Sequence, residues 1–277
     1  MGNFILSAFA DEIADDLKTQ MDVLENHGIH YIEMRNVNGK CIVNYSLDEV
    51  KLIKEELDKK NFKISAIGSP IGKIKITDDF EPHLELFKHT LKVAKILDTK
   101  YIRMFSFFIP QGEDSSKYRD EVLRRLKMFI EAAKGSGITL LHENEKEIYG
   151  DTAERCLDIL LSMNCDYFKA IFDPANFVQC DVKTFPEGFN LLKKYVVYYH
   201  IKDAVYSDYH VEPAGLGDGQ VRDILKELND SDFEGFLSIE PHLSGTSLPG
   251  GGSEKFDVAF KALDKIVTDI TGKSIKL

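Results

Sequence analysis

A short apolar run that ends in polar residues lies in the middle of the chain: Ile138-Thr139-Leu140-Leu141-His142-Glu143-Asn144-Glu145. An amphipathic segment follows at 150–163, and a second apolar run occupies 167–173. A strand pattern, a helical pattern and another strand pattern in succession are typical of a parallel βαβ unit. This stretch therefore predicts a parallel sheet covered by helices.

The same alternation extends to both ends of the chain. Strands are expected at 4–8, 30–34, 63–67, 101–105, 138–143, 167–173, 196–201 and 235–240. Helices are expected at 12–27, 46–60, 79–97, 116–135, 150–163, 183–194, 220–229 and 253–271. Ser46, followed by Glu49, predicts a capping box, and Gly28 and Gly135 mark helix ends.

Eight βα units in 277 residues predict one closed (β/α)8 TIM barrel that forms a single domain over 1–277. A doubly wound open sheet is the alternative. It is disfavoured because no GxGxxG motif follows the first strand and no Pro/Gly/Ser-rich linker divides the chain.

The amino-acid composition indicates which classes of binding partner and which cell compartment to expect. With 43% hydrophobic and 29% charged residues the chain can bury a sizeable core, and its net charge of −11 disfavours nucleic acid and membrane partners. Four cysteines without a CxxC pair are typical of reduced thiols. Because there is also no export signal and no apolar run of about 20 residues, we expect a cytoplasmic protein.

Four consecutive predicted strands end in ionisable residues, namely Glu143, Asp173, His200 and Glu240. In a barrel the carboxyl ends of the strands carry the chemistry, so these side chains are expected to converge. Any one carboxylate could simply cap a helix or form an ion pair. Three carboxylates and an imidazole together favour one divalent cation, Mn²⁺, Mg²⁺, Co²⁺ or Zn²⁺. His142, His210 and His242 are weaker candidates, and strand alternation points His142 away from Glu143.

Four runs of residues resemble the xylose isomerase-like TIM barrel superfamily of sugar phosphate isomerases, epimerases and related proteins. They are His142-Glu143-Asn144, Phe172-Asp173-Pro174-Ala175-Asn176, His200-Ile201-Lys202-Asp203 and Ile239-Glu240-Pro241. The resemblance implies that Glu143, Asp173, His200 and Glu240 bind the metal. Similarity to the ketose 3-epimerase branch implies that Glu143 and Glu240 are also its acid–base pair.

The chain departs from that branch at two places. Asn176 stands where a histidine is common, and Lys202-Asp203 stands where a substrate-binding arginine is expected. The resemblance as a whole implies an isomerase or epimerase of a sugar or sugar phosphate, which works by proton transfer through a metal-stabilised enediolate. It does not specify the sugar, and it leaves a homo-oligomer open.

Three other functions remain open at this point. The first is a metal-dependent dehydratase of an inosose or keto-sugar. The second is an apurinic endonuclease, disfavoured by the acidic charge and by the lack of histidines at the ends of the second to fourth strands. The third is a non-catalytic sugar-binding barrel.

Contacts to a carbohydrate substrate are expected mainly from the first half of the chain. The candidate substrate-binding residues are Glu33, Arg35, Ser69, Arg103, Asn176 and Lys202. The alternative for the arginines and Glu33 is an ion-pair network at the barrel mouth, because such side chains need partners when buried. The glycine-rich segment 215–219 is interpreted mainly as a turn, since Asp218 at its centre argues against binding an anion.

Overall fold

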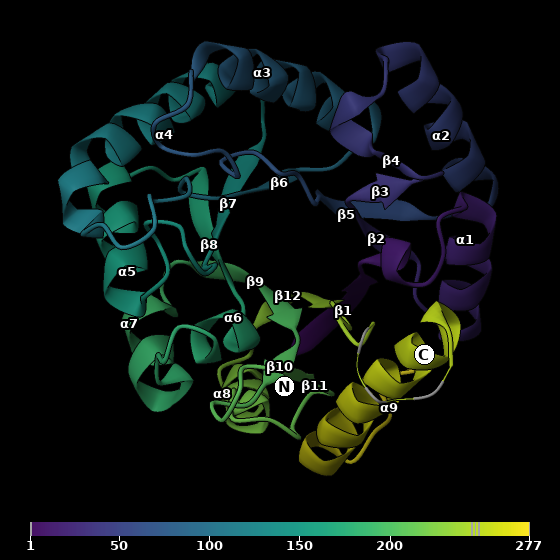
Figure 1. Cartoon of the computed structure of the whole chain (residues 1–277). Coiled ribbons are helices and arrows are strands. Elements are labelled where there is room, and N and C mark those ends of the chain that lie inside the picture. Colours follow the sequence, from purple (N-terminus) through teal and green to yellow (C-terminus); the bar gives the residue numbers. More distant parts are fainter. Residues whose placement is uncertain (1, 245, 247, 249, 277) are drawn as a thin grey trace.

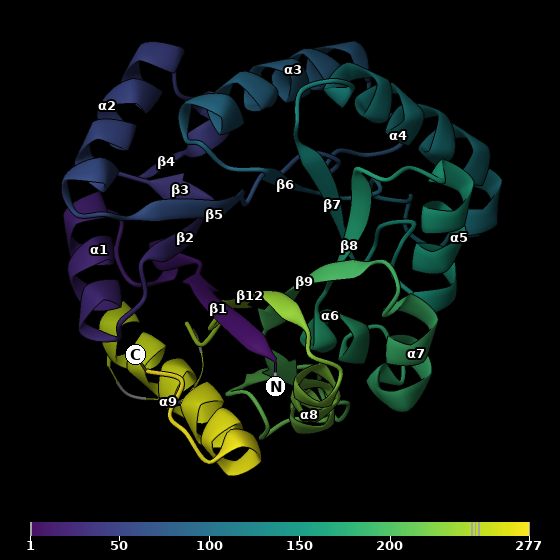
Figure 2. The ribbon, with the colours of Figure 1, turned by 180° about the vertical axis from the view of Figure 1, so that it is seen from behind.

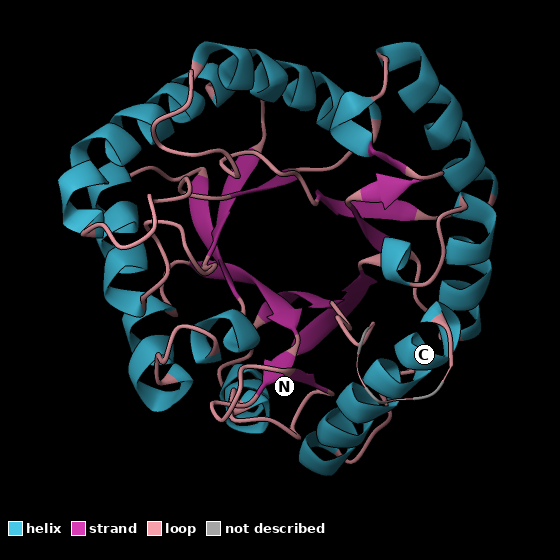
Figure 3. Ribbon diagram, viewed as in Figure 1, coloured by secondary structure: helices cyan, strands magenta, loops and turns pink. Residues whose placement is uncertain are grey.

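Eight parallel strands close into a barrel in the computed structural model, which describes residues 2–244, 246, 248 and 250–276. The strands follow one another around the barrel in the order in which they occur along the chain (Figure 1, Figure 3). They are β1 (Asn3–Ala8), β2 (Tyr31–Met34), β5 (Lys63–Ile67), β6 (Tyr101–Met104), β7 (Thr139–Glu143), β8 (Phe168–Phe172), β9 (Val196–Ile201) and β12 (Glu234–Ile239). The predicted strands and the closed barrel are confirmed, and the open sheet is excluded.

Helices surround the barrel, as both views show (Figure 1, Figure 2). They are α1 (Leu17–Asn26), α2 (Leu47–Lys59), α3 (Glu81–Ile96), α4 (Arg119–Ala133), α5 (Ala153–Met163), α7 (Phe189–Leu192), α8 (Val221–Asp230) and α9 (Gly252–Thr271). The predicted capping box of α2 is present, because Ser46 and Glu49 exchange hydrogen bonds. Gly28 and Gly135 have a positive φ just beyond α1 and α4, as expected for helix ends.

Two predicted helices are shorter in the structure by more than five residues. The helix expected at 12–27 begins only at Leu17, since the Asp16 carboxylate caps it by accepting the Thr19 N–H at 2.8 Å. The helix expected at 183–194 is reduced to a turn at Thr184–Gly188 followed by α7, because Phe185, which precedes Pro186, has extended backbone angles.

Short elements that the sequence did not predict lie at the carboxyl ends of the strands. Two antiparallel hairpins pair β3 (Asn36–Val37) with β4 (Lys40–Cys41), and β10 (Asp203–Ala204) with β11 (Val211–Glu212). The helix α6 (Pro174–Val178) follows β8 directly. These elements stand on the rim of the barrel, where they build the walls of the site.

Strand alternation separates two apolar layers. Ala66, Leu141, Ile171 and Tyr198 pack together in one small cluster, while a much larger core includes Leu140. The His142 ring bonds the Ser106 hydroxyl at 3.0 Å rather than joining Glu143, so the prediction for its direction is confirmed. All four cysteines are free thiols. No helix among the described residues is long and apolar enough to cross a membrane.

Candidate metal centre

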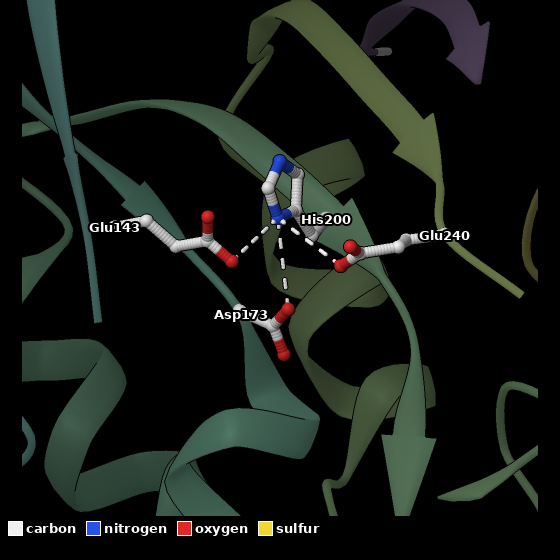
Figure 4. Close-up of side chains that lie close together, drawn as sticks. All are labelled: Glu143, Asp173, His200 and Glu240. Atoms are coloured by element: carbon white, nitrogen blue, oxygen red, sulfur yellow. Dashed lines mark hydrogen bonds and ion pairs between the residues drawn. The ribbon is translucent and has the colours of Figure 1, made fainter. Parts of the chain in front are cut away.

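Four buried side chains meet at the carboxyl ends of β7, β8, β9 and β12 (Figure 4). The His200 Nδ1 atom lies 3.0 Å from Glu143 Oε1, 3.6 Å from Asp173 Oδ2 and 3.7 Å from Glu240 Oε2. Asp173 also caps α6, where its Oδ1 accepts the Asn176 N–H at 2.9 Å, so its Oδ2 is left to face the cluster. The structure thus brings together the four residues that the strand-end pattern selected.

The spacing of these atoms fits a divalent cation. A metal about 2.1 Å from each of four tetrahedral ligands would separate the ligand atoms by about 3.4 Å. The three distances from His200 Nδ1 bracket that value. Asp173 Oδ2 is buried and accepts no hydrogen bond, although the Lys202 ammonium forms an ion pair with it at 2.9 Å. Three carboxylates and one imidazole suit Mn²⁺, Mg²⁺, Co²⁺ or Zn²⁺ better than a thiolate-preferring ion.

Basic side chains hold the two glutamates of the cluster. Arg103 Nη1 donates to Glu143 Oε2 at 3.1 Å, and Arg35 Nη1 donates to Glu240 Oε1 at 3.2 Å. The Lys202 ammonium donates to Glu240 Oε2 at 2.8 Å. Each glutamate therefore presents one oxygen to His200 and has its other oxygen bound to an arginine. Arg103 lies on β6, the neighbour of β7, and Arg35 follows β2.

These contacts keep both glutamates ionised. Burial alone would raise the pKa of Glu143, but the charges of His200 and Arg103 outweigh it and lower the pKa to about 2. Burial likewise opposes ionisation of Glu240, yet Lys202 and then His242 hold its pKa well below the usual value. Both carboxylates are consequently acceptors, not donors, of protons at neutral pH.

A second group of possible ligands adjoins the first. The His242 Nδ1 atom lies 3.0 Å from Glu12 Oε1 and 3.4 Å from Glu240 Oε1. Arg35 already donates to the same two oxygens, at 3.1 and 3.2 Å. Both carboxylate oxygens that face His242 are thus already bound to one guanidinium, and we assign no cation there.

A cavity of about 520 Å³ opens over the cluster. Four of the predicted substrate-binding residues line it, namely Arg35, Arg103, Asn176 and Lys202. The described lining does not include Glu33 or Ser69. The Ser69 hydroxyl is used inside the protein, where it donates to the Arg103 carbonyl and accepts the Ile71 N–H.

Other side chains on the cavity wall carried no clear signal in the sequence. Asn36, Asn44, Gln179 and Val211 line it from loops and short elements. The Lys73 ammonium pairs with Glu145 Oε2 at 2.9 Å on the same wall and lies 4.2 Å from the Phe105 ring centre. Asn36, Asn44, Gln179 and Val211 lie outside the long periodic strands and helices, so only the folded rim identifies them.

The glycine-rich segment after β9 encloses a carboxylate of the protein itself. Asp203 Oδ2 accepts the N–H groups of Gly215 and Gly217 at 2.8 and 3.1 Å. Its Oδ1 accepts those of Ala204 and Gly219 at 2.9 and 2.8 Å. The interpretation of this segment as a turn agrees with these bonds, and Asp203 is what organises it.

Together the closed barrel and the buried Glu/Asp/His cluster define a (β/α)8 protein with a candidate divalent metal centre at the carboxyl ends of its strands. Residues 21–264 match the family model described as xylose isomerase-like TIM barrel, and the chain belongs to this family. No curated protein matches its sequence significantly.

Solved structures share the fold at low sequence identity. An IolI protein with a bound zinc atom is 19% identical, with a TM-score of 0.76 over 98% of this chain and 100% of that one. The probable 3-DHS dehydratase AsbF of petrobactin synthesis, from Bacillus anthracis, is 19% identical (TM-score 0.74; 94% and 98% covered). An L-ribulose 3-epimerase is 14% identical (TM-score 0.74; 98% and 96% covered).

Proposed function

We propose that this protein is a divalent-metal-dependent isomerase or epimerase of a sugar or sugar phosphate. The observation that supports this best is the placement of Glu143 and Glu240, which approach His200 from opposite sides (Figure 4). Both also line the cavity, so a substrate held there would lie between two carboxylates. Glu143, Asp173, His200 and Glu240 would hold the metal.

Proton transfer beside a carbonyl needs a base, a proton return and stabilisation of the enediolate charge. A bound divalent cation supplies Lewis-acid polarisation of the substrate oxygens. Glu143 and Glu240 are ionised, so either accepts a proton from carbon, and the protonated carboxyl then serves as the acid. Arg103 and Arg35 fix the orientation of these carboxylates through one oxygen each.

The remaining polar groups of the cavity would bind substrate hydroxyl and carbonyl oxygens. Arg35, Arg103 and Lys202 are donors on its wall, and Asn176 contributes an amide. The Asn176 Nδ2 group already donates to Glu143 Oε1 at 3.1 Å and to the Asn144 carbonyl at 2.9 Å. Its contribution is therefore chiefly to hold Glu143 at the substrate.

The test is hydrogen exchange on carbon. Protein loaded with Mn²⁺ is incubated in D₂O with ketoses, an inosose and sugar phosphates, and then passed through a chelating resin before deuterium incorporation and new sugars are followed by NMR. We expect exchange at a carbon next to the carbonyl, with formation of an isomer or epimer. Glu143→Gln and Glu240→Gln should slow exchange by about 10²–10⁴-fold, the usual contribution of a general acid–base group.

Glu55→Gln is the matched control, because Glu55 is exposed on α2, far along the chain from the cluster residues. It should leave exchange unchanged. A Glu240→Gln variant that binds Mn²⁺ and exchanges substrate hydrogen at the wild-type rate would exclude the assigned role.

A dehydratase is the second candidate, and the Lys73–Glu145 ion pair is the observation that favours it. This pair lines the cavity beyond the metal-binding cluster and offers a proton source separate from Glu143 and Glu240. Loss of water from a keto-sugar needs such a second group to protonate the departing hydroxyl. An enone or dione absorbance in the same incubations would identify this reaction in place of epimerisation.

A further inference from the structure

The two ring nitrogens of His200 face different partners. Nδ1 faces the three carboxylates of the metal-binding cluster. Nε2 points the other way, to the carboxylate of Glu33 on β2, and lies 3.3 Å from Oε1 and 3.2 Å from Oε2. Glu33 is completely buried, as is His200. Its carboxylate therefore has His200, not a substrate, as its neighbour on this side.

Glu33 lies within strand β2, next to a buried polar chain. The Tyr198 hydroxyl lies beside it, and burial and then the Glu33 charge raise the pKa of that phenol well above its usual value. Tyr198 bonds the Ser65 hydroxyl at 2.9 Å, and Ser65 bonds the Ser7 hydroxyl at 2.6 Å. The chain spans strands β1, β5 and β9, so the position of Glu33 is set by the barrel wall rather than by a mobile rim.

Elementary chemistry shows which group donates the hydrogen bond between His200 Nε2 and Glu33. A carboxylate can only accept, so the hydrogen between the two groups belongs to His200 Nε2. By the same reasoning Nδ1, which lies 3.0 Å from Glu143 Oε1, also carries a proton while no cation is bound. A divalent cation would displace the Nδ1 proton, which leaves the lone pair on Nδ1 and the proton on Nε2. A carboxylate behind the ring also makes that lone pair a stronger ligand, and such partners commonly change metal affinity by about 10–100-fold.

We propose that Glu33 is a positioning residue, which orients His200 and fixes its Nε2–H tautomer so that Nδ1 coordinates the divalent cation. The proposal rests on the metal centre of the proposed function but not on the identity of the sugar or the reaction. It replaces the expectation that Glu33 binds substrate, because the carboxylate lies behind the ligand and outside the described cavity lining.

The experiment measures Mn²⁺ affinity at one fixed pH, from the electron paramagnetic resonance signal of the free ion. Wild type is compared with Glu33→Gln, which keeps an oxygen that accepts the Nε2–H, and with Glu33→Leu, which keeps none. We expect affinity to fall by a few-fold in the first variant and by about 10–100-fold in the second. Glu145→Gln is the matched control: it removes one negative charge from the cavity wall, and the Glu145 carboxylate pairs with Lys73 rather than His200.

A second readout reports the tautomer directly. In protein with ¹⁵N-labelled histidine and bound Zn²⁺, the His200 Nε2 shift should show a protonated nitrogen in wild type and in Glu33→Gln. In Glu33→Leu we expect that signal to broaden or shift as the ring loses its fixed orientation. A purely structural role for Glu33 would lower the melting temperature without moving the affinity or this signal.

Wild-type Mn²⁺ affinity in both Glu33 variants, or an equal fall in Glu145→Gln, would overturn the proposal. If Glu33→Leu does not fold, the Mn²⁺ affinity of Glu33→Gln alone tests the proposal: a fall of a few-fold supports it, and wild-type affinity overturns it. Absence of turnover on every sugar would contradict the proposed function alone, because the affinity and the nitrogen shift are measured without substrate. Failure of the wild type to bind either metal would contradict both.

Discussion

The two arcs of the barrel rim carry different kinds of residue. The arc formed by β7, β8, β9 and β12 contributes the four candidate ligands, each at or just after the end of its strand. The arc that runs from β2 through β5 to β6 contributes Glu33, Arg35 and Arg103, each of which contacts one of those candidate ligands. One arc thus presents the candidate metal-binding atoms, and the other fixes their orientation and charge.

This difference shows why a ligand set alone does not define the centre. Glu143 and Glu240 each have two oxygens, and which one faces His200 is decided by Arg103 and Arg35. The arcs should therefore respond differently to substitution. Loss of a ligand should remove metal binding, whereas loss of a partner should mainly cost stability or affinity.

The largest effect is expected in the ligand arc, from Asp173→Asn. The asparagine can still cap α6 through its side-chain oxygen, so the fold should survive. Mn²⁺ affinity should fall by more than about 100-fold, since even outer partners of a metal ligand account for 10–100-fold. Titration with Mn²⁺ measures it, with Asp48→Asn, an exposed position, as the control. Affinity within tenfold of wild type would remove Asp173 from the ligand set.

The next effect concerns the supporting arc, from Arg103→Met. The guanidinium is almost fully buried against Glu143, and its removal leaves a buried carboxylate short of a partner. The free energy of unfolding should fall by about 3–5 kcal/mol in urea titrations. Arg35→Met should cost less, about 1–3 kcal/mol, because Arg35 is partly exposed and Glu240 keeps Lys202. Equal losses for the two arginines would contradict this ranking.

Two histidines outside the candidate metal-binding cluster should each make the protein less stable in acid. Burial lowers the pKa of both His83 and His142 to about 4, from 6.5 in the unfolded chain. Their contribution to the free energy of unfolding is complete above pH 6.5. It is lost as the pH falls from 6.5 towards 4, because in this range the unfolded state binds protons that the folded state does not. Each adds a slope of up to about 1.4 kcal/mol per pH unit.

Urea unfolding between pH 7 and 5 measures this slope, and His83→Gln should remove its share. Glu143 does not interfere in that range: its pKa is lowered, so its contribution is lost only below the unfolded value of 4.5. A slope that does not change in His83→Gln would show that folding does not lower the pKa of His83.

The smallest expected effect is the loss of stability when a helix cap is removed, and it should be the same on both sides of the barrel. Ser46 caps α2 and Thr152 caps α5, in each case by accepting a backbone N–H at 3.3 Å. Ser46→Ala and Thr152→Ala should each cost about 1 kcal/mol of unfolding free energy. Neither should change Mn²⁺ affinity, which makes them controls for general destabilisation. A change in affinity of more than threefold would couple the outer helices to the metal centre.

How far the sequence could predict the molecule depends on the kind of signal. The strands and the ligand set follow local patterns, since a barrel strand that ends in Glu143 or Asp173 must present it at the rim. The role of Glu33 follows no such pattern, because its partner His200 lies 167 positions along the chain. The hairpins at β3–β4 and β10–β11 were not predicted either, because two-residue strands have no measurable periodicity.

Lys202 is an intermediate case. Its position after β9 placed it at the rim, and the structure turns its ammonium towards Asp173 and Glu240 as well as the cavity. The presence of a lysine at a strand end does not predict which carboxylate its ammonium group will contact. That choice depends on the register between strands, which is a property of the closed barrel.

The carboxylate of Asp203 has a consequence for competition between anions. Its four N–H partners are the type of group that binds phosphate in other barrels after the seventh strand. A carboxylate attached to the same chain is present at an effective concentration on the order of millimolar or above, and it never diffuses away. A free phosphate could bind these N–H groups only by displacing the Asp203 carboxylate. This carboxylate therefore blocks anion binding by the loop.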